Sequence, residues 1–459
     1  MNLSIVVLAA GQGKRMYSDV PKVLHVLAGK PLLEHVYRVA TRLSAERIYV
    51  VYGHGGERVR EALRHLDVTW IEQSRQLGTG HAVAQALPSI DSRNGVLILY
   101  GDVPLITSET LQRLKDAIAE GGIGLLTVDL NDPSGYGRIV RDRSGAVVRI
   151  VEHKDATPEE REIREINTGM MGVPAAHLLR WIERLDDRNA QREYYLTDII
   201  GMAVGERIPI KTVAAGSVYE VMGINDREQL ADLERHYQRL QAQHLMRSGV
   251  TLQDPARFDL RGEIEFGMDV VIDVNVILEG RVKFGDRVHI GPNSYLRDAE
   301  LADDVTVLPN CVLEECAIGT GARIGPFSRI RPTTRLADHV HVGNFVEIKK
   351  STVAAGSKIN HLSYVGDAEV GRDVNVGAGT ITCNYDGANK HKTVIGDGVF
   401  IGSDTLLVAP VRVGDGATIG AGTTLTQDAP PGALTLGRAR QTTIEGWTRP
   451  QKKKTGERE

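Results

Sequence analysis

The feature that most constrains the fold is a six-residue repeat of aliphatic side chains in the second half of the chain. It is clearest near the C-terminus, in one row of residues spaced six apart: Ile395, Ile401, Leu407, Val413, Ile419 and Leu425. An α-helix has a period of 3.6 residues and a strand a period of two, so neither produces this spacing. A β-helix does, because each hexapeptide forms one flat side, three sides close a coil, and the aliphatic residues stack inside.

The repeat begins near residue 264 and is interrupted once. Its first part contains two rows: Val270, Val276, Val282 and Val288, and Ile272, Leu278, Phe284, Ile290 and Leu296. Only 5% of the residues are aromatic and 49 are glycine, which suits tight corners around a small aliphatic core. The polar stretch 382–393, TCNYDGANKHKT, breaks the pattern. It predicts a loop that projects from one edge of the solenoid, where binding loops usually lie.

The first half alternates between strand-like and helix-like segments. Four short apolar runs suit strands buried on both faces: 5–11, 47–53, 95–102 and 122–130. The stretches 31–44 and 108–122 lie between them and are amphipathic. This order predicts a Rossmann-like α/β domain with a mostly parallel sheet and helices on both sides. Ligands of such sheets bind beyond the C-terminal ends of the strands.

The segment 225–247 connects the two halves. It contains no Pro or Gly, and its apolar residues recur near helical spacing: Leu230, Leu233, Tyr237, Leu240 and Leu245. It predicts one long helix that ends at Ser248 and Gly249. We therefore expect three parts: an α/β domain over 1–227, a helical linker over 228–248, and a left-handed parallel β-helix with a C-terminal tail over 249–459.

Charge and cysteine content exclude several classes of protein. With 55 basic and 59 acidic residues the net charge is −4, which argues against nucleic-acid binding. The basic end, Lys452–Lys454, is interpreted as a solvated tail. The cysteines Cys311, Cys316 and Cys383 form no CxxC pair, which argues against structural zinc and for a reducing compartment. No apolar run approaches a membrane span, and the first residues do not resemble a signal peptide, so we expect a soluble cytoplasmic protein without membrane insertion.

A glycine-rich turn follows the first predicted strand, over residues 11–16. A Walker A loop would need glycine where Leu8 stands, and the dinucleotide fingerprint would need one where Met16 stands. The turn therefore belongs to neither type. A glycine-rich turn after a strand still offers backbone N–H groups to phosphate oxygens, and Arg15 and Lys22 add positive charge nearby. By itself the turn leaves a phosphate role open.

Asp102 lies at the end of the strand predicted before YGDVPL. A carboxylate at that position can hold Mg²⁺ against a triphosphate, or it can simply cap the next turn. Four further segments are interpreted as small loops with exposed polar groups, and none identifies a substrate alone: 72–82, 135–139, 152–155 and 165–169.

Together these motifs resemble a known family. In order and spacing, LAAGQGKRM, PKVLH, QLGTGHA, YGDVPL, GYGRIV, EHKDA and EINTG resemble the sugar-nucleotide pyrophosphorylases. The second half adds GPFSRIRP, HVGNFVEIKKS, GDAEVG, NVGAGTITCNYDGANKHKT and IGSDTLLVAPV. The combination, over nearly the whole chain, resembles the bacterial family of bifunctional N-acetylglucosamine-1-phosphate uridyltransferases and glucosamine-1-phosphate acetyltransferases. One departure is Lys14, which stands where the family usually has threonine.

The resemblance implies a uridyltransferase site in the first half. The backbone of four residues would cradle the nucleotide: Leu8, Ala9, Ala10 and Gly11. Arg15 and Lys22 would act on the phosphates as catalytic cations. Uracil would meet Gln73, Gly78 and Thr79, and the ribose and metal would lie near Tyr100, Gly101 and Asp102. The amino sugar would be held by Gly137, Glu152 and Asn167, and Asn225 would join Asp102 in binding Mg²⁺. The sugar phosphate of N-acetylglucosamine-1-phosphate would attack UTP and release pyrophosphate, a transfer that needs charge neutralisation and alignment rather than a covalent nucleophile.

The resemblance also implies an acetyltransferase site in the second half. Acetyl transfer to an amine needs a base, and His361 would be that base, although an arbitrary histidine is more often a surface side chain. Arg331 and Lys349 would clamp the phosphate of glucosamine-1-phosphate, and Tyr364 and Asn375 would complete the sugar pocket. Acetyl-CoA would meet Ala378, Asn384, Tyr385, Ser403, Ala421 and Arg438. Members of this kind are homotrimers whose acetyl site forms where neighbouring β-helices meet. The product, a UDP-sugar, would supply peptidoglycan and lipopolysaccharide synthesis.

Two other functions are weighed against this one. The first is a single-activity pyrophosphorylase whose β-helix only oligomerises or regulates. It would not need the set Arg331, Lys349, His361, Asn384 and Tyr385. The second is a β-helix scaffold that binds partners through its flat faces. It would need an exposed apolar patch outside the repeat core, and the sequence contains no clear one.

Overall fold

The computed structural model describes residues 2–11, 13–53 and 55–450, so the basic end Lys452–Lys454 lies outside the described residues. The chain divides into two compact units. The first comprises Met1–His244 and Asp259–Gly262, and the second comprises Leu245–Phe258 and Glu263–Glu459. The three-part division expected from the sequence stays a prediction.

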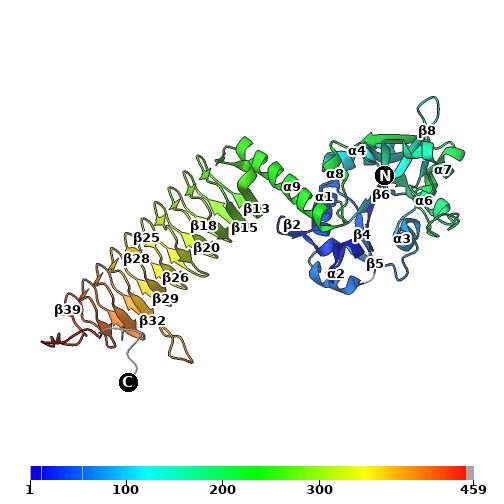
Figure 1. Ribbon diagram of the computed structural model, residues 1–459. Coiled ribbons are helices and arrows are strands. Elements are labelled where there is room, and N and C mark those ends of the chain that lie inside the picture. The colour runs from blue at the N-terminus through cyan, green and yellow to red at the C-terminus, as the bar shows by residue number, and fades with distance from the viewer. Residues whose placement is uncertain (1, 12, 54, 451–459) are drawn as a thin grey trace, which may run out of the picture. The chain divides into compact units, whose positions relative to one another are not determined.

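The first unit is built on a nine-stranded sheet (Figure 1). Its main path runs in the order β11 (Ile210–Ala214), β7 (Ile123–Asp129), β10 (Glu165–Pro174), β6 (Gly95–Tyr100), β1 (Leu3–Ala9), β4 (Arg47–Tyr52) and β5 (Thr69–Glu72). Off this path, β8 (Gly137–Arg141) pairs with β10 and with β9 (Val147–Val151). The pairs β11–β7, β6–β1, β1–β4 and β4–β5 are parallel, as the apolar runs predict.

Helices cover both faces of this sheet because its strands alternate between two hydrophobic clusters. On β1, Val6 and Leu8 face one cluster, and Ile5 and Val7 face the other. The first cluster includes α3 (Thr79–Ala86), α6 (Ala175–Ile182) and α7 (Asp198–Gly205). The second includes α1 (Leu32–Ala40), α2 (Gly56–Ala62) and α4 (Ser108–Ala119). The remaining elements are β2 (Val26–Leu27), β3 (Lys30–Pro31), α5 (Pro158–Arg161), α8 (Val218–Val221) and the long helix α9 (Arg227–Arg247).

Two interpretations of the first half are wrong. Residues 165–169 form the start of β10, a strand inside the sheet that is antiparallel to both β6 and β7, and Gly137 to Ile139 belong to β8. The polar groups of these segments are also not generally exposed, because Gln73 and Asn167 are buried. The sheet is therefore mostly parallel but mixed at β10 and at the β8–β9 hairpin.

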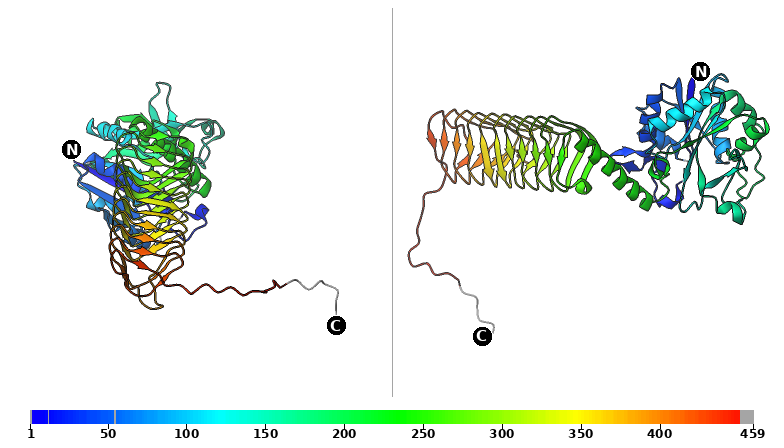
Figure 2. Two further views of the ribbon diagram at one scale, coloured as in Figure 1. Left: turned by 90° about the vertical axis from the view of Figure 1, so that its left-hand side faces the viewer. Right: turned by 90° about the horizontal axis from the view of Figure 1, so that it is seen from above.

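The second unit is a left-handed parallel β-helix whose coils stack in order along the chain (Figures 1 and 2). Its first face contains β12 (Thr251–Leu252), β14 (Val271–Ile272), β16 (His289–Ile290), β19 (Thr306–Val307), β22 (Arg323–Ile324), β25 (His341–Asn344), β28 (Lys358–His361), β31 (Asn375–Val376), β34 (Phe400–Ile401), β37 (Thr418–Ile419) and β39 (Leu434–Thr435).

The two other faces share one long sheet that begins with β13 (Phe258–Glu265) and β15 (Val276–Phe284). The second face contains β17 (Tyr295–Arg297), β20 (Val312–Glu314), β23 (Arg329–Ile330), β26 (Glu347–Lys349), β29 (Tyr364–Gly366), β32 (Ile381–Cys383), β35 (Leu406–Val408) and β38 (Thr424–Leu425). The third contains β18 (Glu300–Leu301), β21 (Ala317–Ile318), β24 (Arg335–Leu336), β27 (Thr352–Val353), β30 (Ala368–Val370), β33 (Thr393–Ile395) and β36 (Val411–Val413).

The predicted aliphatic rows form the core of this unit. Ile401, Leu407 and Ile419 are fully buried, as are the rows near residue 270. Phe400, next to Ile401, is half exposed, because neighbouring side chains on a strand point to opposite faces. Across the polar interruption, Glu369 pairs in parallel with Val394, so the extra residues leave the coil and form the predicted loop.

Candidate functional sites

A cavity of about 290 Å³ opens beyond the C-terminal ends of β1 and β6 in the first unit. It is lined by Leu8, Ala9, Ala10, Gly11, Lys22, Val23, Gln73, Gln76, Gly78, Thr79, Ala82, Tyr100, Asp102 and Glu193. Most of the predicted nucleotide-site residues therefore meet at one place. Gly101 lies just behind it and donates its backbone N–H to the carbonyl of Leu8 at 2.9 Å.

The glycine-rich turn packs tightly against the stem of Lys22. Gly13 has φ of +60°, and a Cβ on it would lie only 2.8 Å from the Cβ of Lys22. Glycine is required here both by the left-handed backbone and by the lack of space. Lys14 and Arg15 follow in a short 3-10 turn and are exposed, and Arg15 does not line the cavity. The turn thus fixes Lys22, while the charge of Arg15 lies outside the cavity wall.

Lys22, Asp102 and Asn225 meet at the wall of the cavity. Lys22 forms an ion pair with Asp102, and its Nζ donates to Oδ1 of Asn225 at 3.2 Å. Two oxygens from distant parts of the chain therefore converge on one cationic position. A carboxylate and an amide oxygen are hard ligands, and Mg²⁺ commonly takes one or two such ligands plus water and phosphate oxygens. These residues fit a divalent cation.

No larger metal cage is found within the described residues. None of their His, Cys, Asp and Glu side chains gather in groups of three or more that could hold a metal ion. A cation at Asp102 and Asn225 would therefore take its remaining ligands from substrate and water, as Mg²⁺ does in phosphoryl-transfer sites.

Gln73, Gly78 and Thr79 form another part of the cavity wall. Gly78 has φ of +104°, and a Cβ on it would lie 2.7 Å from the carbonyl oxygen of Tyr194. The segment at Tyr194 also accepts from Gly80 at 2.8 Å, and Leu196 N–H donates to Thr79 Oγ1 at 3.2 Å. These contacts hold the loop 73–78 and the start of α3 in one conformation. A flat ligand group can thus be bound there with little loss of loop entropy.

The predicted sugar residues lie beside the cavity rather than in its lining. Gly137 on β8 pairs with Asn167 on β10, and the carboxylate of Glu152 accepts from Thr197 Oγ1 at 3.0 Å. Burial raises the pKa of Glu152. Burial, with Glu152 and Asp102 nearby, also raises the pKa of Tyr100. The residues form one polar region next to the nucleotide cavity.

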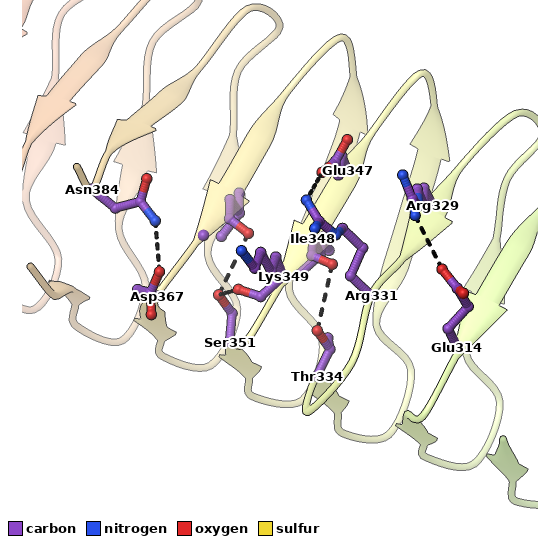
Figure 3. A network of polar contacts seen from close by, with 12 residues as sticks. Glu314, Arg329, Arg331, Thr334, Glu347, Ile348, Lys349, Ser351, Asp367 and Asn384 are labelled. Atoms are coloured by element: carbon purple, nitrogen blue, oxygen red, sulfur yellow. Dashed lines mark hydrogen bonds and ion pairs between the residues drawn. The ribbon is translucent and has the colours of Figure 1, made fainter. Parts of the chain in front are cut away.

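In the second unit, Arg331 on the preceding coil and Lys390 on the polar loop two coils further lie close to Lys349. Arg331 donates to Glu347 Oε1 at 2.7 Å, and its Nε is buried without a hydrogen-bond partner (Figure 3). The neighbouring ammonium of Lys390 and the guanidinium of Arg331 lower the pKa of Lys349. Two carboxylates lie nearby, Glu347 and Asp367, but Asp367 also pairs with Lys350, so they do not balance the positive charge. An anion at this position would relieve the repulsion and satisfy the unpaired donor.

His361 lies at the end of β28, one coil beyond Asn344 on β25. Its Nδ1 is 3.1 Å from Oδ1 of Asn344, which accepts a hydrogen bond, so Nδ1 carries the hydrogen and Nε2 of the neutral ring is left as an acceptor. The ring is exposed. Tyr364 on β29, the next strand of the same coil, and Asn375 on β31, one coil further, are partly buried. A neutral imidazole oriented in this way can accept a proton from an amine.

The polar loop between β32 and β33 carries Asn384 and Tyr385. Asn384 is buried and donates from Nδ2 to Asp367 Oδ2 at 2.6 Å (Figure 3). Tyr385 is exposed and forms an antiparallel bridge with Lys390. The loop thus brings Lys390 toward Lys349 while Asn384 anchors its base.

Four of the six predicted acetyl-CoA residues form a row along one corner of the β-helix: Ala378, Ser403, Ala421 and Arg438. The carbonyl of Ala378 accepts from Asp404, and that of Ser403 accepts from Gly422. The carbonyl of Ala421 accepts from Arg438 Nη1 at 2.8 Å. The row begins next to His361, whose carbonyl accepts from Gly379 at 3.3 Å. An extended ligand along this corner would lead to the imidazole.

Sequence reasoning missed several residues that complete these sites: Asn344, Glu347, Asp367, Lys390 and, at the nucleotide cavity, Gln76, His81 and Glu193. Asn344 precedes His361 by 17 residues, one fewer than three hexapeptides, so the repeat indicates only the neighbourhood of Asn344. The repeat gives no signal for His81, since only the fold brings it against Gln73.

The fold and the sites define a transferase that joins a nucleotidyltransferase-type unit to a hexapeptide-repeat unit. Residues 5–164 match the family model of the MobA-like NTP transferase domain, and residues 392–427 match that of the bacterial transferase hexapeptide with six repeats. Three relatives, each named bifunctional protein GlmU, are similar over nearly their whole length. That of Methylococcus capsulatus is 60% identical, over 98% of both chains. That of Aromatoleum aromaticum is 58% identical, over 99% of this chain and 100% of the relative. That of Azoarcus sp. is 59% identical, over 98% of this chain and 100% of the relative.

The chain therefore belongs to the GlmU family of bifunctional proteins. None of the helices among the described residues is long and apolar enough to cross a membrane.

Proposed function

We propose that the first unit transfers a uridylyl group from UTP to N-acetylglucosamine-1-phosphate, and that the second acetylates glucosamine-1-phosphate with acetyl-CoA. The observation that carries the first activity is the convergence of Asp102 and Asn225 oxygens on the ammonium of Lys22 at the wall of a glycine-lined cavity. The unbalanced cations around Lys349, next to the oriented His361, support the second. The product, UDP-N-acetylglucosamine, supplies cell-wall synthesis.

In uridylyl transfer, a phosphate oxygen of the sugar phosphate attacks the α-phosphorus of UTP, and the bond to the β-phosphate breaks to release pyrophosphate. Lys22 neutralises negative charge on the triphosphate, and the backbone of Leu8 to Gly11 holds it in line. Glu152 and Asn167 orient the amino sugar. Mg²⁺ held by Asp102 and Asn225 supplies further charge neutralisation when bound.

In acetyl transfer, the amine of glucosamine-1-phosphate attacks the thioester carbon of acetyl-CoA. His361 takes a proton from the nitrogen, the carbon–sulfur bond breaks, and the proton passes to the sulfur, so that coenzyme A leaves as the thiol. Arg331, Lys349 and Lys390 bind the sugar phosphate, and Tyr364 and Asn375 position the sugar. The row from Ala378 to Arg438, with Asn384 and Tyr385, binds acetyl-CoA.

We propose a homotrimer in the cytoplasm, with each acetyl site completed by a neighbouring β-helix. The exposure of His361 and Tyr385 supports the assembly, because one chain leaves one side of the site open. All three cysteines are unpaired, which suits a reducing compartment. Sedimentation equilibrium should give three times the chain mass, and a monomeric, fully active protein would refute the shared site.

The experiment that tests the function supplies the full chain with glucosamine-1-phosphate, acetyl-CoA, UTP and Mg²⁺ and identifies products by mass. We expect UDP-N-acetylglucosamine, pyrophosphate and free coenzyme A. Without acetyl-CoA, glucosamine-1-phosphate should remain unconverted. A chain that converts only N-acetylglucosamine-1-phosphate would be a single-activity pyrophosphorylase with a structural β-helix.

A further inference from the structure

The side-chain amide of Gln73 is held in the wall of the nucleotide cavity by two groups of the protein. Its Nε2 lies 3.3 Å from the carbonyl oxygen of Gly78 and 2.9 Å from Nδ1 of His81. Gln73 is buried, with 3% of its surface exposed, and it lines the cavity. Both contacts of the nitrogen are therefore made inside the protein wall.

These contacts assign the orientation of the amide and the tautomer of His81. A backbone carbonyl can only accept, so the Gln73 atom that faces Gly78 must be the NH₂ group. The same nitrogen faces Nδ1 of His81, so Nδ1 accepts and the ring hydrogen is on Nε2. The NH₂ group of Gln85 donates to the His81 carbonyl at 3.1 Å and also faces Nε2, at 3.3 Å. A neutral ring can accept at only one nitrogen, and we assign the acceptor to Nδ1 because its contact with Gln73, at 2.9 Å, is the shorter one.

The neutral form of His81 that this arrangement needs is favoured by its surroundings. Burial, and the positive charge of Arg75, lower the pKa of His81. The ring also lies against Tyr194, with the two ring centroids 6.5 Å apart. A protonated imidazole would donate from Nδ1 and would oppose the NH₂ group of Gln73.

With both hydrogens directed at the wall, the amide oxygen Oε1 is the polar atom that Gln73 has left for a ligand. We propose that His81 is a positioning residue that gives the first unit its preference for uracil over cytosine, by holding Gln73 with Oε1 toward the base. Uracil offers one donor on its pairing edge, N3–H, which Oε1 accepts. Cytosine has an unprotonated N3 there, and its lone pair would face Oε1. The inference rests on the proposed uridylyl transfer.

The test compares UTP with CTP in the full chain and in two variants. H81L removes the acceptor at similar volume, and H81N places an amide oxygen near the former Nδ1. We expect H81L to lower the ratio of kcat/KM for UTP to that for CTP about tenfold or more, because Gln73 can then rotate and present its NH₂ group. The change should be in KM, since the base is remote from the reacting phosphorus. H81N should restore the ratio.

A purely structural role for His81 would lower both rates together and leave the ratio unchanged, which would overturn the proposal. If H81L does not fold, the tautomer of His81 in the wild-type chain still tests the proposal. The ¹⁵N resonances of His81, identified by their loss in H81N, should show a protonated Nε2 and an unprotonated Nδ1, and the opposite tautomer refutes the assignment. A wild-type chain that uses neither UTP nor CTP would instead refute the proposed function.

Discussion

At the scale of single residues, Lys22 shows how one side chain can prepare a site for charged substrates. Its ammonium holds two oxygens, on Asp102 and Asn225, that come from distant parts of the first unit's sequence. It also lies against the glycine-rich turn that lines the cavity. Losing either oxygen should therefore damage the site without disturbing the fold around it.

We predict that D102N and Asn225→Ala each lower uridylyl transfer by about 10²-fold or more, since several kcal/mol of charge stabilisation depend on these oxygens. Acetyl transfer should persist in both variants. The measurement is the rate of pyrophosphate release at saturating UTP, with coenzyme A release as the internal control. Equal loss of both activities would indicate misfolding and leave the metal assignment without support.

His361 is the second residue for which we predict a large and selective loss of activity. His361→Ala should lower acetyl transfer by about 10²–10⁴-fold, the usual cost of removing a general base. Uridylyl transfer to N-acetylglucosamine-1-phosphate should be unchanged. His289→Ala, on an exposed histidine of the same face, serves as the control. A wild-type rate for His361→Ala at saturating substrates would refute the assignment.

The cations around Lys349 give a prediction with a pH dependence. Because Lys390 and Arg331 lower the pKa of Lys349, the site loses positive charge as the pH rises through that lowered pKa. The KM for glucosamine-1-phosphate should therefore increase toward high pH. Lys390→Met should raise KM about tenfold near neutral pH by removing one charged hydrogen-bond donor, and it should shift the pH-dependent rise to higher pH.

Lys392→Met is the matched control for that variant. Lys392 lies on the same loop but pairs with Glu369, away from the cluster. It should leave KM and its pH dependence unchanged. If Lys390→Met and Lys392→Met behave alike, the cluster does not bind the phosphate.

At the scale of elements, the repeated strands of the β-helix can be predicted from the sequence. Strands that depend on contacts across the α/β sheet cannot. Ile395, Ile401 and Ile419 are core residues, as their spacing predicts, because a six-residue period has few structural solutions. Strand β10 was misread at 165–169, because Asn167 and Gly169 lie at an irregularity in its pairing with β7 and resemble a loop locally. Site residues carried by a family motif could be placed, whereas Lys390 and His81 act through neighbours that only the fold supplies.

Removing the loop between β32 and β33 should abolish one activity while changing the stability of the β-helix little. We predict that replacing Tyr385–Lys390 with a two-residue turn abolishes acetyl transfer, because Tyr385 and Lys390 are lost. Strands β32 and β33 keep their pairing with β35 and β36, so the thermal unfolding midpoint should change by only a few degrees. Circular dichroism melts and both activity assays are the measurements. Persistent acetyl transfer would refute the role of the loop.

At the scale of the whole molecule, the question is where the first unit ends. The beginning of α9 belongs to the core of that unit: Leu233 is fully buried in a cluster with Met16, Leu27 and Ile224. Glu234 accepts from the backbone of Ala28 at 2.7 Å. A boundary at residue 227 would remove these contacts, although the cavity lies entirely before it.

We predict that fragments 1–227 and 1–244 both transfer uridylyl groups, and that 1–244 is the more stable. Losing Leu233 from its cluster resembles a large-to-small core substitution, which costs about 2–5 kcal/mol. Urea unfolding followed by circular dichroism should therefore give a higher midpoint for 1–244, with no difference in turnover once both are folded. Leu240, which is exposed on the same helix, allows a control: Leu240→Ala should leave the stability of 1–244 almost unchanged, whereas Leu233→Ala should bring it close to that of 1–227. A folded 1–244 without uridylyl transfer would show that the activity needs the second unit.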